Sequence, residues 1–177
     1  LNEALVHNGD FANYHATSEY LRQRGYEPQF MTDTEVSIML FDLWNRVYGY
    51  PLEVIIEALA PTGELDFDML SEEKQVLYEA VQSTHIQASP DGPWFFIIAR
   101  HVPETKTFQL IRIPDTAMLR PQVFSIYDGK AQIGLICSEK QAIDATLRSI
   151  SSEDSRFRPV AEKYWNARGG PGSNCGA

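Results

Sequence analysis

Two short motifs near the start of the chain contain residue types that could do chemistry. The first is His7-Asn8-Gly9, in which an asparagine side-chain amide and a glycine backbone N–H can both donate hydrogen bonds to one developing negative oxygen. Glycine lets the backbone come close to such an oxygen because it has no Cβ. Taken alone, an Asn-Gly pair more often marks a tight turn, because both residues tolerate positive φ.

The second motif is Thr32-Asp33-Thr34-Glu35. It predicts a capping box, in which Thr32 accepts a hydrogen bond from the Glu35 amide and the Glu35 side chain reaches back. An acid at this position is favoured by the helix dipole and needs no further function. The functional alternative is a partly buried carboxylate at Asp33 that binds an ammonium group. The residues alone favour the structural interpretation.

The chain around these motifs predicts the elements that must position them. Residues 1–6 are expected to form a strand, and His7 to Asp10 a turn. A helix is expected from Tyr14 to Arg24, with Gly25 ending it. The strongest helical pattern follows Thr32 and runs to about Val47, with apolar residues at helical spacing: Val36, Met39, Leu40, Leu43, Trp44 and Val47.

An acidic stretch comes next. Pro51 suits the first turn of a helix over 52–59, and residues 53–79 hold eight acidic side chains against one base, Lys74. Ser71 is expected to cap a further helix that runs to about Gln82. We interpret residues 51–89 as a solvated helical excursion on the surface and not as a second domain.

The second half of the sequence reads mainly as strands. A turn is predicted at Pro90-Asp91-Gly92-Pro93, followed by a strand at 94–99 that is apolar enough to be buried on both faces. Further strands are predicted at 108–113, 123–127 and 132–137, with a hairpin turn at Asp128-Gly129. Ser138 is expected to cap a helix over 139–150. Helices before and after a group of strands indicate an α+β domain.

Composition excludes several classes of protein. The 177 residues carry 15 basic and 24 acidic side chains, a net charge of −9, which argues against a nucleic-acid-binding surface. No stretch approaches the roughly 20 apolar residues of a membrane helix, and no signal peptide is recognisable, so we expect a soluble cytoplasmic protein. The histidines do not have the spacing of metal ligands: His7, His15, His85 and His101.

Together the two motifs resemble the class II glutamine amidotransferases, which are N-terminal-nucleophile (Ntn) hydrolases. The matching residues are His7-Asn8-Gly9 and Thr32-Asp33-Thr34-Glu35. Three later segments also resemble the family, so that the likeness covers about residues 3–150: the strand at 91–99, Asp115 with Leu119-Arg120-Pro121, and Ser138-Glu139 before a helix. The chain is most similar to stand-alone amidotransferase subunits related to glutamate synthase.

The resemblance implies a fold and a reaction. The fold is a four-layer α/β/β/α sandwich, incomplete at its N-terminal strands, with a partial domain at 1–168 and a flexible Gly-rich tail at 169–177. The reaction is that of a glutaminase, in which an N-terminal Cys attacks the glutamine side-chain amide and its own α-amine is the base. Asn8 and Gly9 correspond to the oxyanion hole, and Asp33 to the carboxylate that binds the α-amino group of glutamine. The implied partner is an ammonia-accepting synthase domain or subunit, and no cofactor is implied.

The sequence departs from the family at the nucleophile. No Cys stands at the start, and neither Cys137 nor Cys175 has a free α-amine beside its sulfur. We therefore expect an N-terminally truncated chain that is inactive alone. Two alternatives stay open: a non-catalytic glutamine-binding or partner-docking module of the same fold, and an α+β interaction domain in which the motifs are only a turn and a cap.

Overall fold

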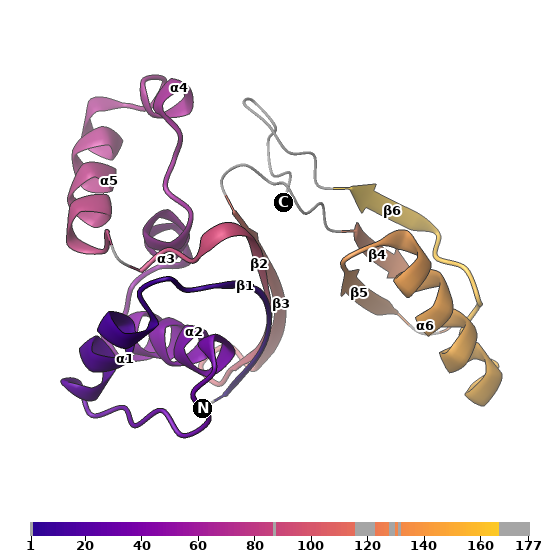
Figure 1. The fold of residues 1–177 in the computed structure, drawn as a ribbon. Helices are drawn as coiled ribbons and strands as arrows, with labels where there is room; N and C mark the ends of the chain where they lie inside the picture. Colours follow the sequence, from indigo (N-terminus) through magenta and orange to yellow (C-terminus); the bar gives the residue numbers. More distant parts are fainter. Residues whose placement is uncertain (1, 87, 116–122, 128–129, 131, 167–177) are drawn as a thin grey trace. The chain divides into compact units, whose positions relative to one another are not determined.

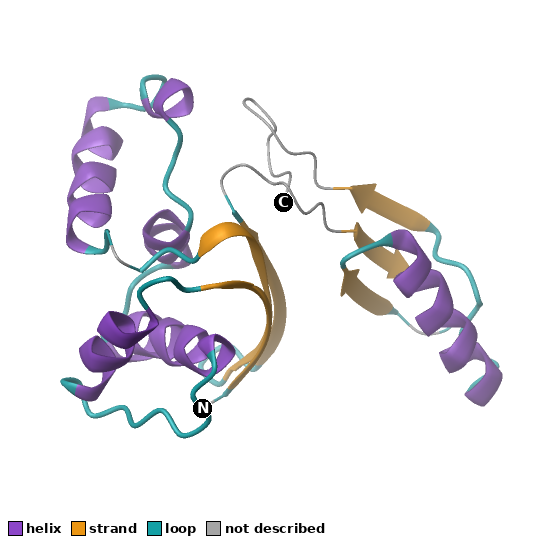
Figure 2. Ribbon diagram, in the orientation of Figure 1, coloured by secondary structure: helices purple, strands orange, loops and turns teal. Residues whose placement is uncertain are grey.

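The chain divides into two compact units, Leu1–Ala117 and Met118–Ala177. The computed structural model describes residues 2–86, 88–115, 123–127, 130 and 132–166 (Figure 1). Both units combine helices with a small antiparallel sheet, so the predicted α+β class is confirmed (Figure 2). The single domain expected over 1–168 stays a prediction, and the tail at 169–177 lies outside the described residues.

The sheet of the N-terminal unit has three strands. They are β1 (Glu3–Asp10), β2 (Asp91–Val102) and β3 (Thr107–Pro114), and β2 lies in the centre, antiparallel to both neighbours. This central position agrees with the apolar run that predicts a buried strand. Burial alternates along β1, because successive side chains of a strand point to opposite faces.

The helices of this unit lie on one side of the sheet (Figure 1). Helix α1 (Tyr14–Arg22) is followed by α2 (Asp33–Asp42), which continues directly into a π-helical turn at Leu43–Val47. The core between helices and sheet contains the largest fully buried side chains, among them Leu21, Leu40, Phe41, Trp44, Trp94, Phe96, Ile98 and Ile113. Burial of this apolar surface holds the layer of helices on the sheet.

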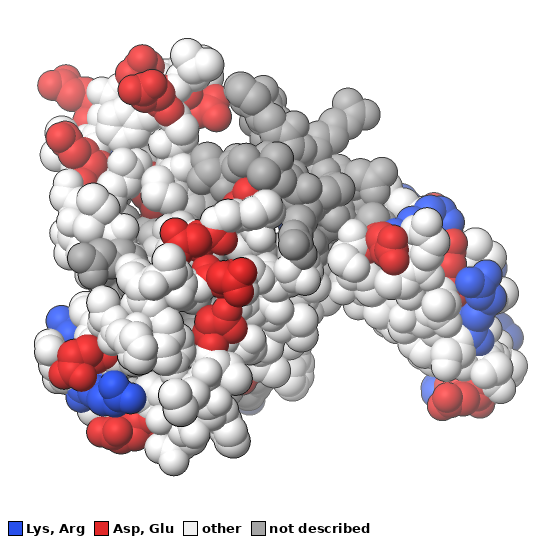
Figure 3. Space-filling view, in the orientation of Figure 1, with Lys and Arg blue, Asp and Glu red and all other residues white. Residues whose placement is uncertain are grey.

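The predicted helical excursion is confirmed as α3 (Leu52–Leu59), α4 (Glu64–Phe67) and α5 (Glu72–Thr84). Acidic side chains gather over α4 and α5 (Figure 3). The expectation that the acids are merely solvated is wrong for Glu57, which is 3% exposed. Its carboxylate accepts hydrogen bonds from the Thr62 amide at 2.9 Å and from Gln82 Nε2 at 2.6 Å, and so ties α3 to α5.

The other face of the sheet carries no helix among the described residues of this unit. Apolar side chains point from it into solvent: Val6 is 60% exposed, Phe108 84% and Leu110 41%. Cross-strand pairing sets Ala99 beside Leu110 and His101 beside Phe108 on this face. The N-terminal unit is therefore a sheet with one covered face and one open, partly apolar face.

The C-terminal unit is a smaller two-layer structure. Strands β4 (Val123–Tyr127), β5 (Ile133–Cys137) and β6 (Lys163–Asn166) form an antiparallel sheet in the order β5-β4-β6. Helix α6 (Lys140–Glu153) packs Ile143 and Leu147 against the sheet. The sequence predicted β4, β5 and α6 but missed β6, and the hairpin expected at Asp128-Gly129 lies outside the described residues.

Two predicted turns are wrong. His7 to Asp10 continue β1, and Asp91 to Pro93 begin β2. Pairing between the two strands explains both errors, because it joins Asp10 to Asp91 and extends the ladder through the glycine-containing segments. A positive φ at Gly9 is accommodated as an irregularity of the ladder between Asn8 and Asp10 and not as a chain reversal.

Helix capping is confirmed only in part. Thr32 Oγ1 accepts a hydrogen bond from the Glu35 amide at 3.3 Å, as predicted. The Glu35 carboxylate does not reach back to Thr32. It accepts hydrogen bonds from the backbone amides of Gln29 and Phe30 instead, each at 2.8 Å. Ser71 occupies the N-cap of α5 without a side-chain capping bond, and the N-cap of α6 is Glu139 instead of the expected Ser138.

Candidate functional site

The candidate site lies at the end of β1, where the strand is irregular. Asn8 pairs with Phe95 and Asp10 with Asp91, so Gly9 has no partner in the register. A Cβ built on Gly9 would lie 2.4 Å from the Cβ of Trp94 and 2.8 Å from Nε2 of His7. Its φ of +154° is also unfavourable for other residues. This position therefore requires glycine, which lets the backbone of β1 approach β2 closely.

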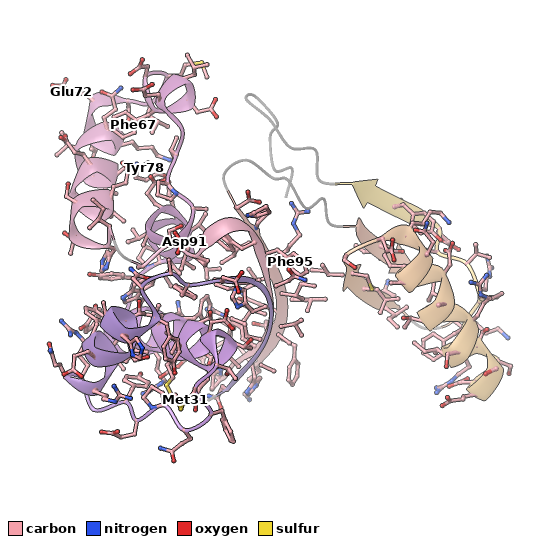
Figure 4. The ribbon with its side chains drawn as sticks, in the orientation of Figure 1. Met31, Phe67, Glu72, Tyr78, Asp91 and Phe95 are labelled. Atoms are coloured by element: carbon pink, nitrogen blue, oxygen red, sulfur yellow. The ribbon has the colours of Figure 1, made fainter. Side chains whose placement is uncertain are left out.

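Asn8 and His7 point to opposite sides of β1. His7 is directed to the covered face, where its side chain is 1% exposed, whereas Asn8 is exposed. The cross-strand partner of Asn8 is Phe95, so the two side chains share a face of the sheet. Phe95 is labelled in Figure 4. The Asn8 side chain therefore lies on the open face, next to Gly9, which has no partner in the strand register.

Asp33 is the first residue of α2, and its side chain is 29% exposed. Its Oδ1 lies 3.7 Å from Nδ1 of His7, which is beyond a hydrogen bond but within the range of an ion pair. The helix N-terminus favours a negative charge at this position. Asp33 therefore combines partial burial with an exposed edge, as the binding of an ammonium group requires.

His7 is the buried neighbour that controls the charge of this pair. Its ring packs edge-on against Phe96 at 4.9 Å and lies 6.0 Å from Phe11. Burial lowers the pKa of His7 below its ordinary value of 6.5, and this effect outweighs the opposing attraction of Asp33 and Asp10. A neutral His7 does not neutralise Asp33, so the negative charge of the carboxylate remains available to a cationic group.

Two side-chain-to-backbone contacts fix the chain around the site. Asp91 Oδ2 accepts a hydrogen bond from the Ala12 amide at 2.6 Å, immediately beyond β1. On the other side, Glu35 holds the loop before α2, in which Met31 has a φ of +51° and is 79% exposed. A positive φ in a non-glycine residue costs energy and is most often found where function or local structure demands it.

The structure thus brings His7, Gly9 and Asp33 together around the end of β1. Two hollows of the described residues lie elsewhere, one beside Trp44 and one beside His101, and neither is lined by Asn8, Gly9 or Asp33. Sequence reasoning missed the roles of His7 and Asp91. The signal for His7 was its place in the strand, since it alternates with Asn8 and must face the core if Asn8 is exposed.

The remaining candidates contribute little to a reaction. Cys137 is half-buried at the end of β5, and burial raises the pKa of its thiol, which disfavours the thiolate. Cys175 and residues 119–121 lie outside the described residues.

No group of three or more potential metal ligands occurs in the described part of the chain. Among the described helices, none combines the length and the apolar composition needed to cross a bilayer.

Comparison with known proteins finds a relative of this chain in an archaeon. An uncharacterized protein of Archaeoglobus fulgidus is 32% identical over 151 residues. The matched part is 85% of this chain but 37% of that protein, so the chain spans little more than a third of the relative's length. No family model matches the chain, and no solved structure matches it.

Replacing Gly9 with alanine should destabilise the N-terminal unit by about 1–3 kcal/mol, because the new methyl group would overlap Trp94. Chemical denaturation followed by circular dichroism measures the loss. Gly63→Ala is the matched control, since Gly63 has an ordinary φ of −69° and nothing lies within 4 Å of its built Cβ. An equal loss in both variants would contradict the assigned close approach.

Acidification below pH 6.5 should destabilise the protein through His7. The lowered pKa means that the unfolded state binds the proton first, so stability is fully present above the unfolded pKa and falls as the pH decreases through it. Unfolding free energies at pH 7 and pH 5 test this. His7→Phe should reduce the decrease, and His85→Phe should reduce it as well, because burial also lowers the pKa of His85. A decrease that is unchanged in His7→Phe would exclude His7 as a source.

Proposed function

We propose that the chain is a partial glutaminase domain of a class II glutamine amidotransferase, acting in the cytoplasm on the side-chain amide of glutamine. The observation that carries the proposal is the irregular end of β1, where the obligatory Gly9 adjoins His7 and, through it, the Asp33 carboxylate at the start of α2, whereas Asn8 lies on the opposite face of the strand. The resemblance of both motifs to that family supplies the reaction. The uncharacterized relative neither favours nor opposes it.

In the proposed reaction, Asn8 and Gly9 form the oxyanion hole. The register is interrupted here, with the single Gly9 of β1 facing residues 92–94 of β2, and in the proposal the Gly9 amide donates to the oxyanion. The Asn8 side-chain amide is the second donor. Donors placed where negative charge develops typically contribute about 10²–10³ in rate each.

Asp33 binds the α-ammonium group of glutamine in this proposal. The neutral state of His7 supports this role, because a protonated imidazole 3.7 Å away would compete with the substrate for the carboxylate. The contact exists before and during the reaction. Its loss should therefore weaken substrate binding and raise KM, with a smaller effect on kcat.

The nucleophile in the proposed mechanism is a cysteine outside the 177 residues. Its sulfur attacks the amide carbon, its α-amine takes and returns the proton, ammonia leaves, and water then hydrolyses the thioester to glutamate. The length of the Archaeoglobus fulgidus protein is compatible with further chain, since the match covers 37% of it. Ammonia passes to a synthase domain or subunit.

The proposed complete fold is the four-layer α/β/β/α sandwich. One helix layer and one sheet correspond to the N-terminal unit, whose open face carries Val6, Phe108 and Leu110. In the proposal a second sheet covers this face, which removes the exposed apolar side chains from water. Asn8 would then lie between the two sheets, because it is presented on the same face.

The central experiment reads the parent coding sequence upstream of Leu1 and expresses the longer chain. If the mature protein begins with Cys, glutamate release should fall about 10²–10³-fold in Asn8→Ala, mainly in kcat. Asp33→Asn should raise KM for glutamine at least tenfold. Asn2→Ala and Asp66→Asn are the matched controls, since both residues lie outside the proposed site, and their activity should be unchanged.

A parent protein that does not begin with Cys would overturn the proposal of a glutaminase. It would favour the alternative, a non-catalytic glutamine-binding module. Calorimetry then decides: the module requires glutamine binding that is lost in Asp33→Asn and retained in Asp66→Asn. If the parent begins with Cys but glutamate release survives both Asn8→Ala and Asp33→Asn, the assigned residue roles are wrong.

The open sheet face should make the 177-residue chain self-associate. Sedimentation velocity should show concentration-dependent oligomers that are dispersed by Phe108→Lys combined with Leu110→Lys, because charges replace exposed apolar surface. Phe30→Lys is the control, since Phe30 is 77% exposed but lies in the loop before α2. A monodisperse wild-type monomer that melts cooperatively would count against an uncovered face.

A further inference from the structure

Helices α4 and α5 form an arm of the N-terminal unit that the candidate site does not use. The arm comprises residues 64–84, and Figure 1 shows that it extends away from the sheet and from α1 and α2. Gln75 Nε2 donates to the Phe67 carbonyl at 3.0 Å and joins the two helices, and the Tyr78 hydroxyl donates to Glu53 of α3 at 2.6 Å. These bonds fix the arm to α3, so its outer surface keeps a defined shape.

Apolar side chains are exposed on the outer surface of this arm. Four of them are between 46% and 76% exposed: Leu65, Met69, Val76 and Leu77. Leu65 and Met69 are four residues apart and point to one side of α4 and the turn after it. Val76 precedes the buried Tyr78 by two residues and therefore points to the opposite side of α5. Exposed apolar side chains that gather in one segment with charged neighbours are typical of a surface that contacts another molecule.

Negative charge without a counter-charge surrounds these apolar side chains. Residues 64–84 contain one base, Lys74, and six acids: Glu64, Asp66, Asp68, Glu72, Glu73 and Glu79. The Lys74 ammonium is already paired with Glu53 of α3 at 2.7 Å, and none of the six carboxylates forms an ion pair with a described residue. Figure 3 shows the acids over α4 and α5 with no basic side chain among them in that view. The repulsion between these carboxylates decreases when a cationic group approaches them.

Three of these acids surround Val76 on the surface of α5. Glu72 and Glu73 precede it by four and three residues, and Glu79 follows it by three, which are the spacings of neighbours on one side of a helix. Figure 4 shows Glu72 on the side of α5 away from Tyr78. The outer side of α5 therefore presents an apolar side chain enclosed by carboxylates.

The charge of the arm selects the class of partner. Nucleic acids and anionic membranes carry negative charge themselves and are repelled by it. A second copy of the chain would bring another arm with six acids and one base, so repulsion also opposes contact between two arms. Residues 64–84 contain two helices and no strand, so they offer no sheet edge to which an extended peptide could add. A positively charged helix with one apolar side complements both the carboxylates and the apolar side chains.

We propose that the arm binds a basic amphipathic helix of another protein. The apolar side of that helix covers Val76 and its exposed apolar neighbours, and its lysine or arginine side chains pair with Glu72, Glu73 and Glu79. Because Glu72 and Glu79 are seven residues apart, or about 10.5 Å along α5, basic residues at a seven-residue spacing suit the partner. This inference does not depend on the proposed glutaminase, because the arm contains none of its proposed site residues.

Fluorescence anisotropy of a labelled synthetic peptide tests the proposal with the 177-residue chain at pH 7. The probe has three repeats of Lys-Leu-Ala-Lys-Leu-Ala-Ala, which place the leucines on one side of a helix and lysines at a seven-residue spacing. It should bind saturably and about tenfold more tightly than a peptide of the same composition whose leucines are spread around the helix. An increase in salt concentration from about 0.05 M to about 0.5 M should weaken binding about tenfold, because salt screens the charges.

Two triple variants with the same change in net charge locate the binding surface. Peptide affinity should decrease about tenfold when three glutamates of the arm are neutralised together: Glu72→Gln, Glu73→Gln and Glu79→Gln. It should change by less than about twofold when three exposed glutamates outside the arm are neutralised together: Glu27→Gln, Glu104→Gln and Glu153→Gln. The difference separates attraction by the arm from attraction by the net charge of −9.

A pair of double variants tests the apolar contact. Met69→Ala combined with Val76→Ala should weaken peptide binding about fivefold, because it removes exposed apolar surface that the leucines cover. Phe30→Ala combined with Val160→Ala is the matched control, since both side chains are exposed outside the arm, and it should bind the peptide as wild type does.

Absence of saturable binding of the amphipathic peptide would overturn the proposal, as would an equal loss of affinity in the two triple variants. Equal affinity for the amphipathic and the rearranged peptide would show attraction by charge alone and would overturn the assignment of an amphipathic helix. Circular dichroism checks that each variant is folded. If the triple variant of the arm fails to fold, the comparison of the two double variants and the preference between the two peptides still decide the question.

Discussion

The close passage of β1 over β2 at Gly9 is the constraint on which the candidate site depends. The backbone lies so near Trp94 that no Cβ fits between them, and the ladder is irregular at the same residue. Before this point, the alternation of β1 sets which of its residues face the helices and which face the open side. This alternation places His7 beside Asp33 and Asn8 on the opposite face. Replacement of a single hydrogen by a methyl group would disturb all of these positions together.

The one-sided covering of the sheet has electrostatic consequences. His7 is enclosed by aromatic rings on the covered face, and the loss of hydration there outweighs the attraction of two nearby carboxylates. Asp33 stays at the margin of the same layer, where water still reaches it. A buried neutral base beside a half-exposed acid leaves a localised negative charge, which suits the recognition of an ammonium group.

Helix α2 links two features of different character. Its N-terminus carries Asp33, and its C-terminal continuation carries Trp44, which is fully buried in the core. The acidic helices after it are integrated into the unit by their own side chains: Glu57 ties α3 to α5, and Glu53 accepts hydrogen bonds from Lys74 and Tyr78 of α5. This segment is therefore a structural part of the N-terminal unit and not only a charged surface.

The sequence alone determined the strands, helices and caps that depend only on residues near one another in the chain. The apolar run at 94–99 marked the central strand, the helical spacing behind Thr32 marked α2, and the Thr32 cap formed as its residue type requires. The sequence did not reveal that Gly9 and Gly92 lie within paired strands. A glycine with positive φ occurs both in turns and in irregular strands, and only the position of the partner strand distinguishes the two. Likewise, Glu35 was free to cap its own helix or to hold the preceding loop. The neutral state of His7, the burial of Glu57 and the hollow beside Trp44 arise from segments distant in the chain, and only tertiary packing decided them.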